Sequence, residues 1–296
     1  SWGGSTWGTP RSTDSSDVKL SNSQWSLNLW GEDLIATVRG GAIYYYDTSS
    51  SPNRAVLVSS LAGATSVPTT TTLTTISFPD RHVLALGTDP LSSSGNIDPM
   101  QVRWSDQEDF AVWAPTVTNT AGDQRLEVGT KIVSATTSKD ETVIATDEAL
   151  YGMTFVGPPF IFSFRLLATN CGSAGKNVMM TVDSTVFWMG RSNFFVYDGI
   201  VKELPCSVQH FVFERMQKDY IDKSFAAHNK EYNEVSWFYV STSNSAGTAN
   251  PEPDSYVTFN YQDQAWSIGS LNRTVWSDAF GVRNVPFAFD ENGLFY

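Results

Sequence analysis

The sequence is poor in the side chains that most often build metal centres and disulfide frameworks. It has only three histidines and two cysteines in 296 residues. His82, His210 and His228 show neither H-x-x-x-H nor H-E-x-x-H spacing, so no zinc site is predicted. Cys171 and Cys206 are too few for a disulfide framework, and we expect reduced, buried thiols. No metal and no cofactor are therefore expected.

Charge and long apolar runs are also scarce. Charged residues make up 17% of the chain, below the usual figure of about 25%. No run reaches the ~18 apolar residues of a membrane span, so we expect no membrane insertion. The net charge is −12, and the 19 lysines and arginines are scattered along the sequence. This scatter argues against a surface that holds DNA by its charge, whereas an acidic lining would repel phosphates and let DNA slide.

Two common catalytic motifs are absent. The sequence has neither a G-x-S-x-G elbow nor a G-x-x-x-x-G-K-[ST] phosphate loop. Acidic pairs that could serve a glycoside hydrolase do occur, at Glu32–Asp33, Asp106–Asp109, Asp147–Glu148 and Asp290–Glu291. The last two fall at predicted turns, where an Asp that bonds its own backbone explains them. We expect no enzyme, with a glycoside hydrolase as the less favoured alternative.

What the sequence does contain is a recurring hairpin. Each copy is a short apolar run, a polar or Gly turn, and a second run rich in aromatics. Four clear copies are Leu34–Asp47, Glu141–Met153, Ser184–Gly199 and Pro286–Tyr296, and two weaker ones are His82–Gly87 and Glu234–Ser241. Their turns recur at intervals of roughly 43 to 60 residues, near the ~40–50 residues of a propeller blade. We predict an all-β fold, a β-propeller of about six blades, with a large β-sandwich as the alternative.

The chain divides into an arm and a body. Residues 1–23 are rich in Gly, Ser and Thr and predict a flexible arm, and residues 24–296 form the propeller. Two insertions are expected: a helix over 208–222, from apolar residues at helical spacing, and a loop over 241–255. Most tryptophans fall in or beside predicted strands and should pack in the core. The possible interface residues are Trp2, Trp7, Phe211 and Tyr220.

A further set of motifs lies between about Val102 and Trp276. They are Arg103–Gln107, Thr118–Asp123, Gly157–Phe160, Asn170–Gly172, Val186–Gly190, Phe194–Gly199, Leu204–Cys206, Asn233–Tyr239 and Tyr256–Trp266. In these motifs the chain resembles the propeller-bearing tail proteins of tailed bacteriophages, of the nozzle or DNA-stabilisation type. The motifs are strands and turns rather than an active site, and residues 1–80 match less clearly.

The resemblance implies a role in assembly. Nozzle proteins form rings, commonly of six subunits, that continue the DNA channel and bind fibres or a plug. We therefore expect a ring homo-oligomer, a hexamer, with adaptor, fibre or plug proteins as partners. Genomic DNA would pass without sequence-specific binding, and the protein would reside in the virion tail after assembly in the host cytoplasm. The alternative is a carbohydrate-binding module of a fibre or baseplate, with Trp2 and Trp7 on a host glycan.

Overall fold

Strands dominate the structure. The computed structural model describes residues 24–49, 54–139, 141–243, 251–278 and 285–296. These residues form 22 strands, one α-helix and two 3-10 helices. The strands make five four-stranded sheets and one two-stranded sheet, and within each sheet neighbouring strands are consecutive in sequence and antiparallel. The all-β prediction is confirmed.

The first three sheets occupy the N-terminal half. The first contains β1 (Trp25–Trp30), β2 (Asp33–Val38), β3 (Ile43–Tyr46) and β4 (Val56–Leu57), followed by the 3-10 helix η1 (Val58–Ser60). The second contains β5 (Thr71–Ile76), β6 (Val83–Thr88), β7 (Asp98–Trp104) and β8 (Gly122–Arg125). The third contains β9 (Ile132–Ser138), β10 (Glu141–Thr146), β11 (Ala149–Gly157) and β12 (Ile161–Thr169).

The other three sheets follow in the same way. The fourth contains β13 (Met179–Val182), β14 (Thr185–Met189), β15 (Phe194–Tyr197) and β16 (Val201–Leu204). The helix α1 (Gln209–Arg215) and the 3-10 helix η2 (Lys218–Lys223) lead into the fifth. The fifth contains β17 (Phe225–Asn229), β18 (Glu234–Tyr239), β19 (Ser255–Asn260) and β20 (Ala265–Ser270), and the sixth has β21 (Val275–Ser277) and β22 (Phe287–Phe289).

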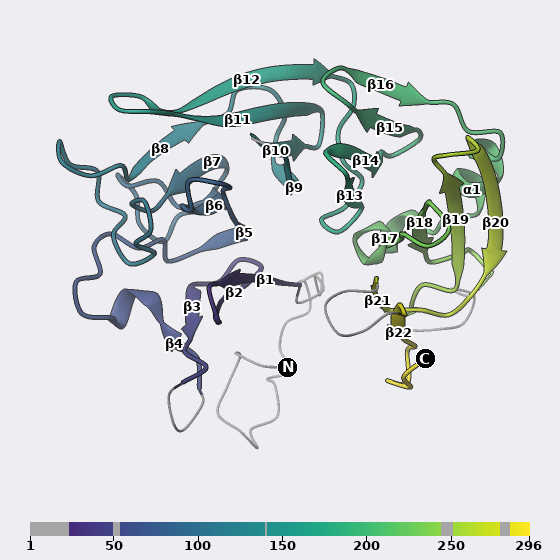
Figure 1. The fold of residues 1–296 in the computed structure, drawn as a ribbon, viewed down its shortest axis with the longest axis horizontal. Helices are drawn as coiled ribbons and strands as arrows, with labels where there is room; N and C mark the ends of the chain where they lie inside the picture. Colours follow the sequence, from purple (N-terminus) through teal and green to yellow (C-terminus); the bar gives the residue numbers. More distant parts are fainter. Residues whose placement is uncertain (1–23, 50–53, 140, 244–250, 279–284) are drawn as a thin grey trace.

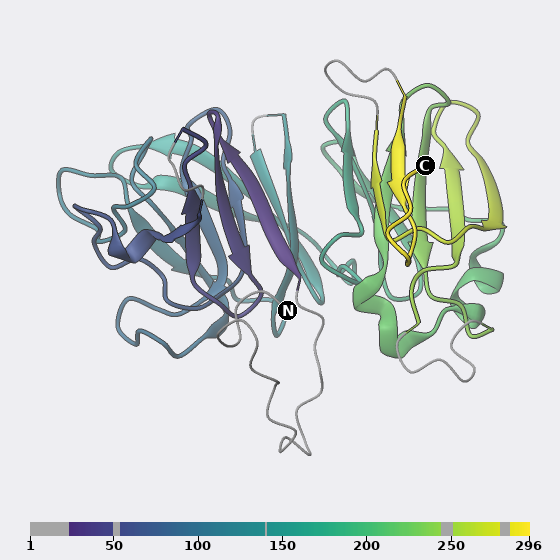
Figure 2. The ribbon, with the colours of Figure 1, turned by 90° about the horizontal axis from the view of Figure 1, so that it is seen from below.

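The sheets are arranged radially. In Figure 1 the first strand of each four-stranded sheet lies nearest the centre of the ring. Each of these strands contacts the first strand of the next sheet, from β1 and β5 through to β17 and β21. Figure 2 shows the strands running from one face of the ring to the other. The fold is thus a β-propeller, and the sandwich alternative is wrong.

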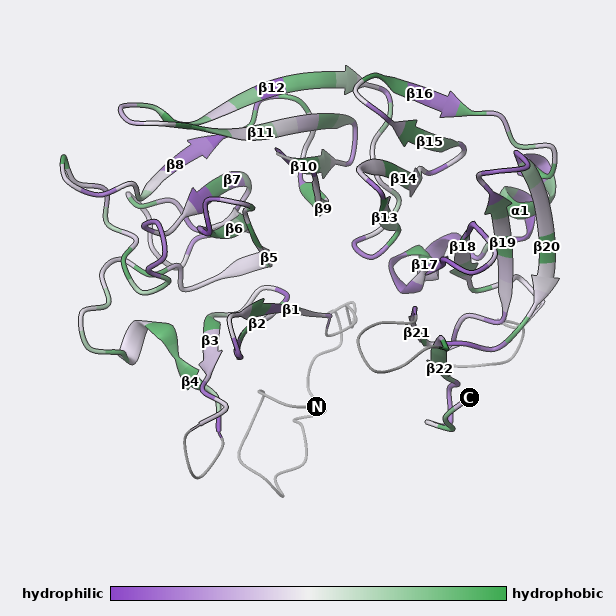
Figure 3. Cartoon of the chain, in the orientation of Figure 1, coloured by the Kyte–Doolittle hydropathy of each residue, from purple (hydrophilic) through white to green (hydrophobic). Residues whose placement is uncertain are grey.

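Burial follows this arrangement. The buried apolar side chains group into five clusters, and each cluster lies between two consecutive sheets. Figure 3 shows hydrophobic residues along the middle strands of several sheets and many hydrophilic ones in the connections. No such cluster of described residues joins the sixth sheet to the first.

The recurring hairpin corresponds to the second and third strands of a sheet. The three copies at Leu34–Asp47, Glu141–Met153 and Ser184–Gly199 fold as β2–β3, β10–β11 and β14–β15. The two weaker copies supply β6 and β18. The copy at Pro286–Tyr296 also turns back on itself: Ala288 and Tyr296 exchange two backbone hydrogen bonds (3.2 and 3.0 Å), and Phe289 bridges to Phe295. Its first run is β22, which pairs with β21 on its other side.

The helix expected over 208–222 is shorter and is interrupted. It divides into α1 and η2, with Met216 between them in an extended conformation (φ −73°, ψ 129°). Backbone hydrogen bonds to the segment after β18 replace the helical ones: Gln217 N–H donates to the Val240 carbonyl at 2.8 Å, and Met216 bridges to Ser241. Val212 of α1 and Met216 at its C-cap enter the same buried cluster, and Ile221 of η2 packs against it, so apolar residues at helical spacing face one core from two short helices. The loop expected over 241–255 does lie between β18 and β19, although residues 244–250 are outside the described part.

Indole N–H groups tie sheets to their predecessors. Four tryptophans of the fourth to sixth sheets each donate to a backbone carbonyl outside their own sheet. The pairs are Trp188 with Cys171 (2.8 Å), Trp237 with Val178 (2.9 Å), Trp266 with Pro205 (2.8 Å) and Trp276 with His228 (3.0 Å). A buried indole N–H needs such a partner, so these bonds fix neighbouring sheets as well as filling space.

The fourth sheet offers a direct test of this packing. Phe187 and Trp188 of β14 point to opposite faces and are both buried, in two different clusters. Phe187→Ala or Trp188→Ala should each lower the free energy of unfolding by about 3–5 kcal/mol, from lost burial and the cavity left behind. Chemical denaturation measures this, with the fully exposed Val117→Ala as the control. A loss below about 1 kcal/mol for both variants would contradict the packing.

Candidate functional site

The described residues contain no assembled metal site and no disulfide. No group of three or more His, Cys, Asp or Glu side chains comes together there. Cys171 is buried and Cys206 partly buried, and the two thiols do not pair. Burial raises the pKa of the Cys171 thiol to about 11, so it stays protonated at neutral pH. None of the helices in the described residues is long and apolar enough to cross a membrane.

A cavity of about 870 Å³ is lined by residues in or beside the strands nearest the centre of the ring, including Thr72 of β5 and Ile132 of β9 (Figure 1). Propellers surround a central channel, and we call this cavity the channel mouth. Its wall comes from the channel ends of the first four sheets and from η2. The charged side chains in this wall are Arg39, Lys131, Lys176, Arg191, Lys218, Asp219 and Asp222. The sequence scatters its basic residues, but the fold brings five of them to one opening. The sequence does not reveal this, because the five residues lie in separate connections and in η2, and only the fold brings them together.

The predicted interface residues do not form one surface. Trp2 and Trp7 lie outside the described residues. Phe211 of α1 is partly exposed, and the Arg215 guanidinium lies 4.0 Å from the centre of its ring. Tyr220 of η2 is half-buried and lines the channel cavity, whereas Phe211 is not part of that wall.

The first sheet has an exposed apolar face that the sequence did not predict. Ser26 and Asn28 of β1 hydrogen-bond Thr74 of β5, so this face meets the second sheet. Side chains alternate along a strand, so the next positions point the other way. They are Trp25, Leu27 and Leu29, which are 39%, 62% and 75% exposed. This face, called the β1 face below, looks away from the second sheet.

The two-stranded sixth sheet has a matching apolar face. Trp276 packs on Phe238 of the fifth sheet, with ring centres 6.2 Å apart, so that side is covered. Val275 and Phe287 alternate with the covered positions, and the Phe295 ring stacks on Phe287 at 5.9 Å. Val275 is half exposed and Phe295 slightly more than half. We call this the β22 face.

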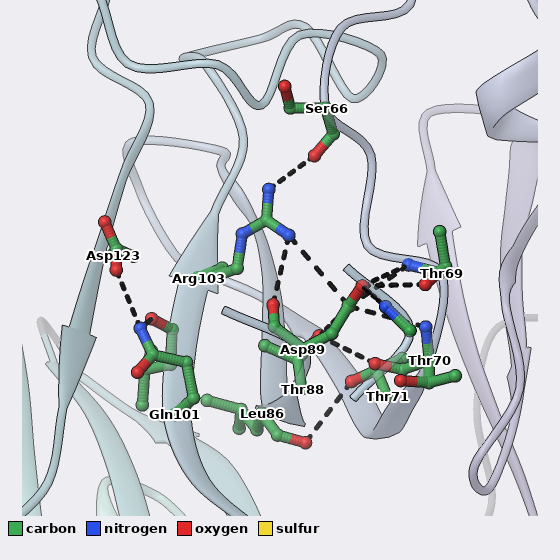
Figure 4. Close-up of polar contacts among 12 residues, drawn as sticks. Ser66, Thr69, Thr70, Thr71, Leu86, Thr88, Asp89, Gln101, Arg103 and Asp123 are labelled. Atoms are coloured by element: carbon green, nitrogen blue, oxygen red, sulfur yellow. Dashed lines mark hydrogen bonds and ion pairs between the residues drawn. The ribbon is translucent and has the colours of Figure 1, made fainter. Parts of the chain in front are cut away.

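A buried ion pair organises the second sheet (Figure 4). Asp89 follows β6 and is completely buried; its carboxylate accepts hydrogen bonds from Thr69 N–H (3.1 Å), Thr69 Oγ1 (2.7 Å) and Gly95 N–H (2.9 Å). Arg103 of β7, also buried, lies 4.0 Å from that carboxylate. Its guanidinium donates to the carbonyl of Asp89 at 3.2 Å and to that of Ser66. The network joins the connection from the first sheet to two strands of the second.

The surroundings of Asp89 favour its charged form beside the Arg103 guanidinium. Burial raises the pKa of Asp89, but hydrogen bonds from Gly95, Thr69 and Thr70, with the charge of Arg103, outweigh it and hold the pKa below its usual value. Burial lowers the pKa of Arg103, although its neighbouring carboxylates oppose this. Neither side chain reaches solvent, so we assign the pair a structural role.

A second buried network surrounds His82. Its Nδ1 lies 2.6 Å from Asp80 and its Nε2 lies 3.0 Å from the Thr120 hydroxyl. The order Asp–His–hydroxyl is that of a catalytic triad. However, the Thr120 hydroxyl donates to Asp106 at 2.6 Å, so its proton points away from the imidazole. Phe162 of β12 packs edge-on against the ring at 5.0 Å, which leaves His82 as a buried packing residue.

The acidic pairs lie at separate places around the ring, in or after the first, second, third and sixth sheets. Asp290 behaves as predicted for a turn residue, accepting from the N–H groups of Asn292 (2.8 Å) and Leu294 (2.9 Å). Asp147 differs from that prediction in its main partner. It accepts from the N–H (2.8 Å) and hydroxyl (2.5 Å) of Thr130, and so fixes the connection before β9.

Asp89→Ala should lower the free energy of unfolding by about 3–5 kcal/mol, because Arg103 would then be buried without its counter-charge. The matched control is Asp98→Ala in the same sheet, whose partner Arg125 is largely exposed at 2.7 Å. That change should cost about 1 kcal/mol or less. Denaturant titrations at pH 7 compare the two variants, and equal losses would contradict the structural role.

The stability difference between wild type and Asp89→Ala should depend on pH in one direction. The folded-state pKa of Asp89 is lowered, so its contribution is fully present above the unfolded value of about 3.9 and is lost as the pH falls through the folded value. The stability difference between wild type and Asp89→Ala should therefore shrink as the pH is lowered below about 4. A difference that stays constant from pH 7 to pH 3 would show that the charge of Asp89 is not involved.

Comparison with known proteins supports the fold and leaves the family open. No family model and no curated protein matches the sequence. Among solved structures, the computationally designed Ika8 protein has a TM-score of 0.52 and 13% identity, covering 91% of this chain and 69% of its own. The dihydro-heme d1 dehydrogenase NirN has a TM-score of 0.50 and 12% identity, covering 90% of this chain, which spans 51% of NirN. BamB from Moraxella catarrhalis has a TM-score of 0.42 and 11% identity, covering 91% of this chain and 80% of its own. At 13% and 12% identity, the likeness to Ika8 and NirN concerns the fold alone.

Proposed function

We propose that this chain is a structural protein of a phage tail, a nozzle or tail-hub component. In this role it assembles with copies of itself into a ring, a hexamer, that forms part of the DNA conduit. The ring also serves as a docking platform for adaptor, fibre or plug proteins. The observation that carries the proposal is the exposed β1 face, because contiguous exposed apolar side chains mark interaction sites.

The nature of the family-like motifs also supports this role. Val186–Gly190 falls on β14, Phe194–Gly199 on and just after β15, and Tyr256–Trp266 on the β19–β20 hairpin. Many side chains of these motifs are buried between sheets, including Trp188 and Phe194. If the chain is a structural tail component, the residues it shares with other such proteins should be those that pack its rigid body, as these motifs do.

The two apolar faces suit a ring contact. A ring closes through a heterologous interface, in which two different patches meet. The β1 face and the β22 face are different, both apolar, and carried by the first and last sheets of the chain. We propose that the β1 face of one subunit packs on a neighbouring copy, with the β22 face as its counterpart. The carbohydrate-binding alternative depends on Trp2 and Trp7, which lie outside the described residues.

The experiment is the oligomeric mass of the full chain by light scattering, with negative-stain imaging. Wild type should form a closed ring, and the double variant Leu27→Ser/Leu29→Ser should be mainly monomeric. Val117→Ser, a fully exposed valine in the loop before β8, is the matched control and should assemble as wild type does. Each removed contact side chain should weaken the interface about tenfold or more.

A wild-type chain that stays monomeric at its highest soluble concentration would overturn the assembly proposal. A ring that forms equally well in Leu27→Ser/Leu29→Ser would overturn the β1 face as its contact. A folding defect is separable, because both leucines are exposed and the circular dichroism spectrum of the variant should match wild type.

A further inference from the structure

The charge of the channel mouth is opposite to that of the chain. The sequence has 31 acidic and 19 basic residues, yet the cavity wall carries five basic and two acidic side chains, named above. About a quarter of all basic residues in the chain therefore line one opening, from the ends or connections of the first, third and fourth sheets and from η2. An acidic protein that gathers cations at one cavity creates a local attraction for anions.

Most of these cations have no counter-charge. Arg39 pairs with Asp222 at 3.3 Å. Lys131, Lys176 and Arg191 form no ion pair with any residue that the structure describes, and the same holds for Lys218. The cavity thus has free cationic groups on several sides rather than a set of neutralised pairs.

Lys176 points most directly to a ligand. It lies in the connection between β12 and β13, and its Nζ is buried with no hydrogen-bond partner among the described residues. Burial, and to a smaller extent the nearby charge of Arg39, lowers the pKa of Lys176 to about 8. A buried ammonium without a partner is costly, and an anion bound in the cavity would supply both the missing acceptor and the missing charge.

The cavity has the size of a small-molecule site. Its volume of about 870 Å³ is within the usual range of ~300–1,000 Å³ for ligand pockets. Besides the cations, its wall includes Tyr220 and Ile221 of η2, an aromatic and an aliphatic residue. A wall of this kind fits an organic anion better than a bare ion, and lysine and arginine together favour phosphate groups.

We propose that the mouth of the central channel binds a small phosphate-bearing molecule of nucleotide size, with Lys176 as the innermost phosphate contact. Lys131, Arg191 and Lys218 surround the phosphates from neighbouring elements, and the Arg39–Asp222 pair holds η2 in place at one side of the site. The inference does not depend on the proposed tail function, and either could fail while the other holds.

The test is isothermal titration calorimetry of the full chain with ATP and, separately, with inorganic pyrophosphate. We expect one site per chain, weakened by added salt. Lys176→Met should weaken binding about tenfold or more, because a charge-assisted hydrogen bond is lost. Since the variant also removes an unpaired buried cation, its melting temperature should equal or exceed that of wild type, which separates lost binding from lost folding.

A matched pair of lysines controls for general charge. Lys131 and Lys139 flank the same strand, β9, and only Lys131 lines the cavity. Lys131→Gln should weaken binding and Lys139→Gln should not. Tighter binding of ATP than of pyrophosphate would assign a contribution to the base and ribose, and equal binding would assign the site to the phosphates alone; both support the proposal.

Three outcomes would overturn it. The first is no binding of either ligand at millimolar concentration. The second is equal weakening by Lys131→Gln and Lys139→Gln, which would mean a diffuse charge effect. The third is a duplex DNA oligonucleotide that binds more tightly than ATP and with the same dependence on Lys176, which would make the mouth a nucleic-acid contact.

Discussion

Every sheet in this chain has two apolar faces, and a single sheet cannot cover either of them. The radial arrangement solves this problem by placing a cluster of buried side chains between each sheet and the next. The indole bonds of Trp188, Trp237 and Trp276 act in the same interfaces, so polar and apolar contacts fix the same geometry. The first and sixth sheets each have a neighbouring sheet on only one side within the described clusters, so each keeps one apolar face exposed. The assembly proposal is built on these two faces.

The sequence predicted the central hairpin of each sheet better than the outer strands and the helix. A run such as that around Phe187 has the alternation, aromatics and turn of a central hairpin, and central strands are buried enough to show it. Outer strands such as β4, β8 and β16 are short or polar, since one side faces solvent, and they leave no comparable pattern. The stretch around Met216 shows the opposite case. Its apolar residues have helical spacing, but backbone hydrogen bonds to the segment after β18 interrupt the helix and divide it into α1 and η2.

The sites are harder to foresee than the fold, for a physical reason. Asp89 and Arg103 are ordinary charged residues in sequence, and only the packing of β6 and β7 brings them together with no access to water. The cations of the channel mouth are separated by tens of residues, and each is unremarkable in its own unit. Their meeting depends on the radial arrangement of the sheets, which brings connections of the first, third and fourth sheets and η2 to one opening. By contrast, the turn acid Asp290 uses its nearest neighbours, and the sequence alone predicted it.

The contact of η2 with the first sheet has a mechanical consequence. Asp222 receives a hydrogen bond from Gln24 on its carbonyl and an ion pair from Arg39 on its carboxylate, and 183 residues separate Arg39 from Asp222. This contact lies at one side of the channel mouth and acts as a cross-brace between the first sheet and the segment that enters the fifth. A force that spreads the first and fifth sheets apart is borne by this brace as well as by the contacts around the circumference. Its strength depends on one partly exposed ion pair, so the stiffness of the ring at this end should soften as the salt concentration rises.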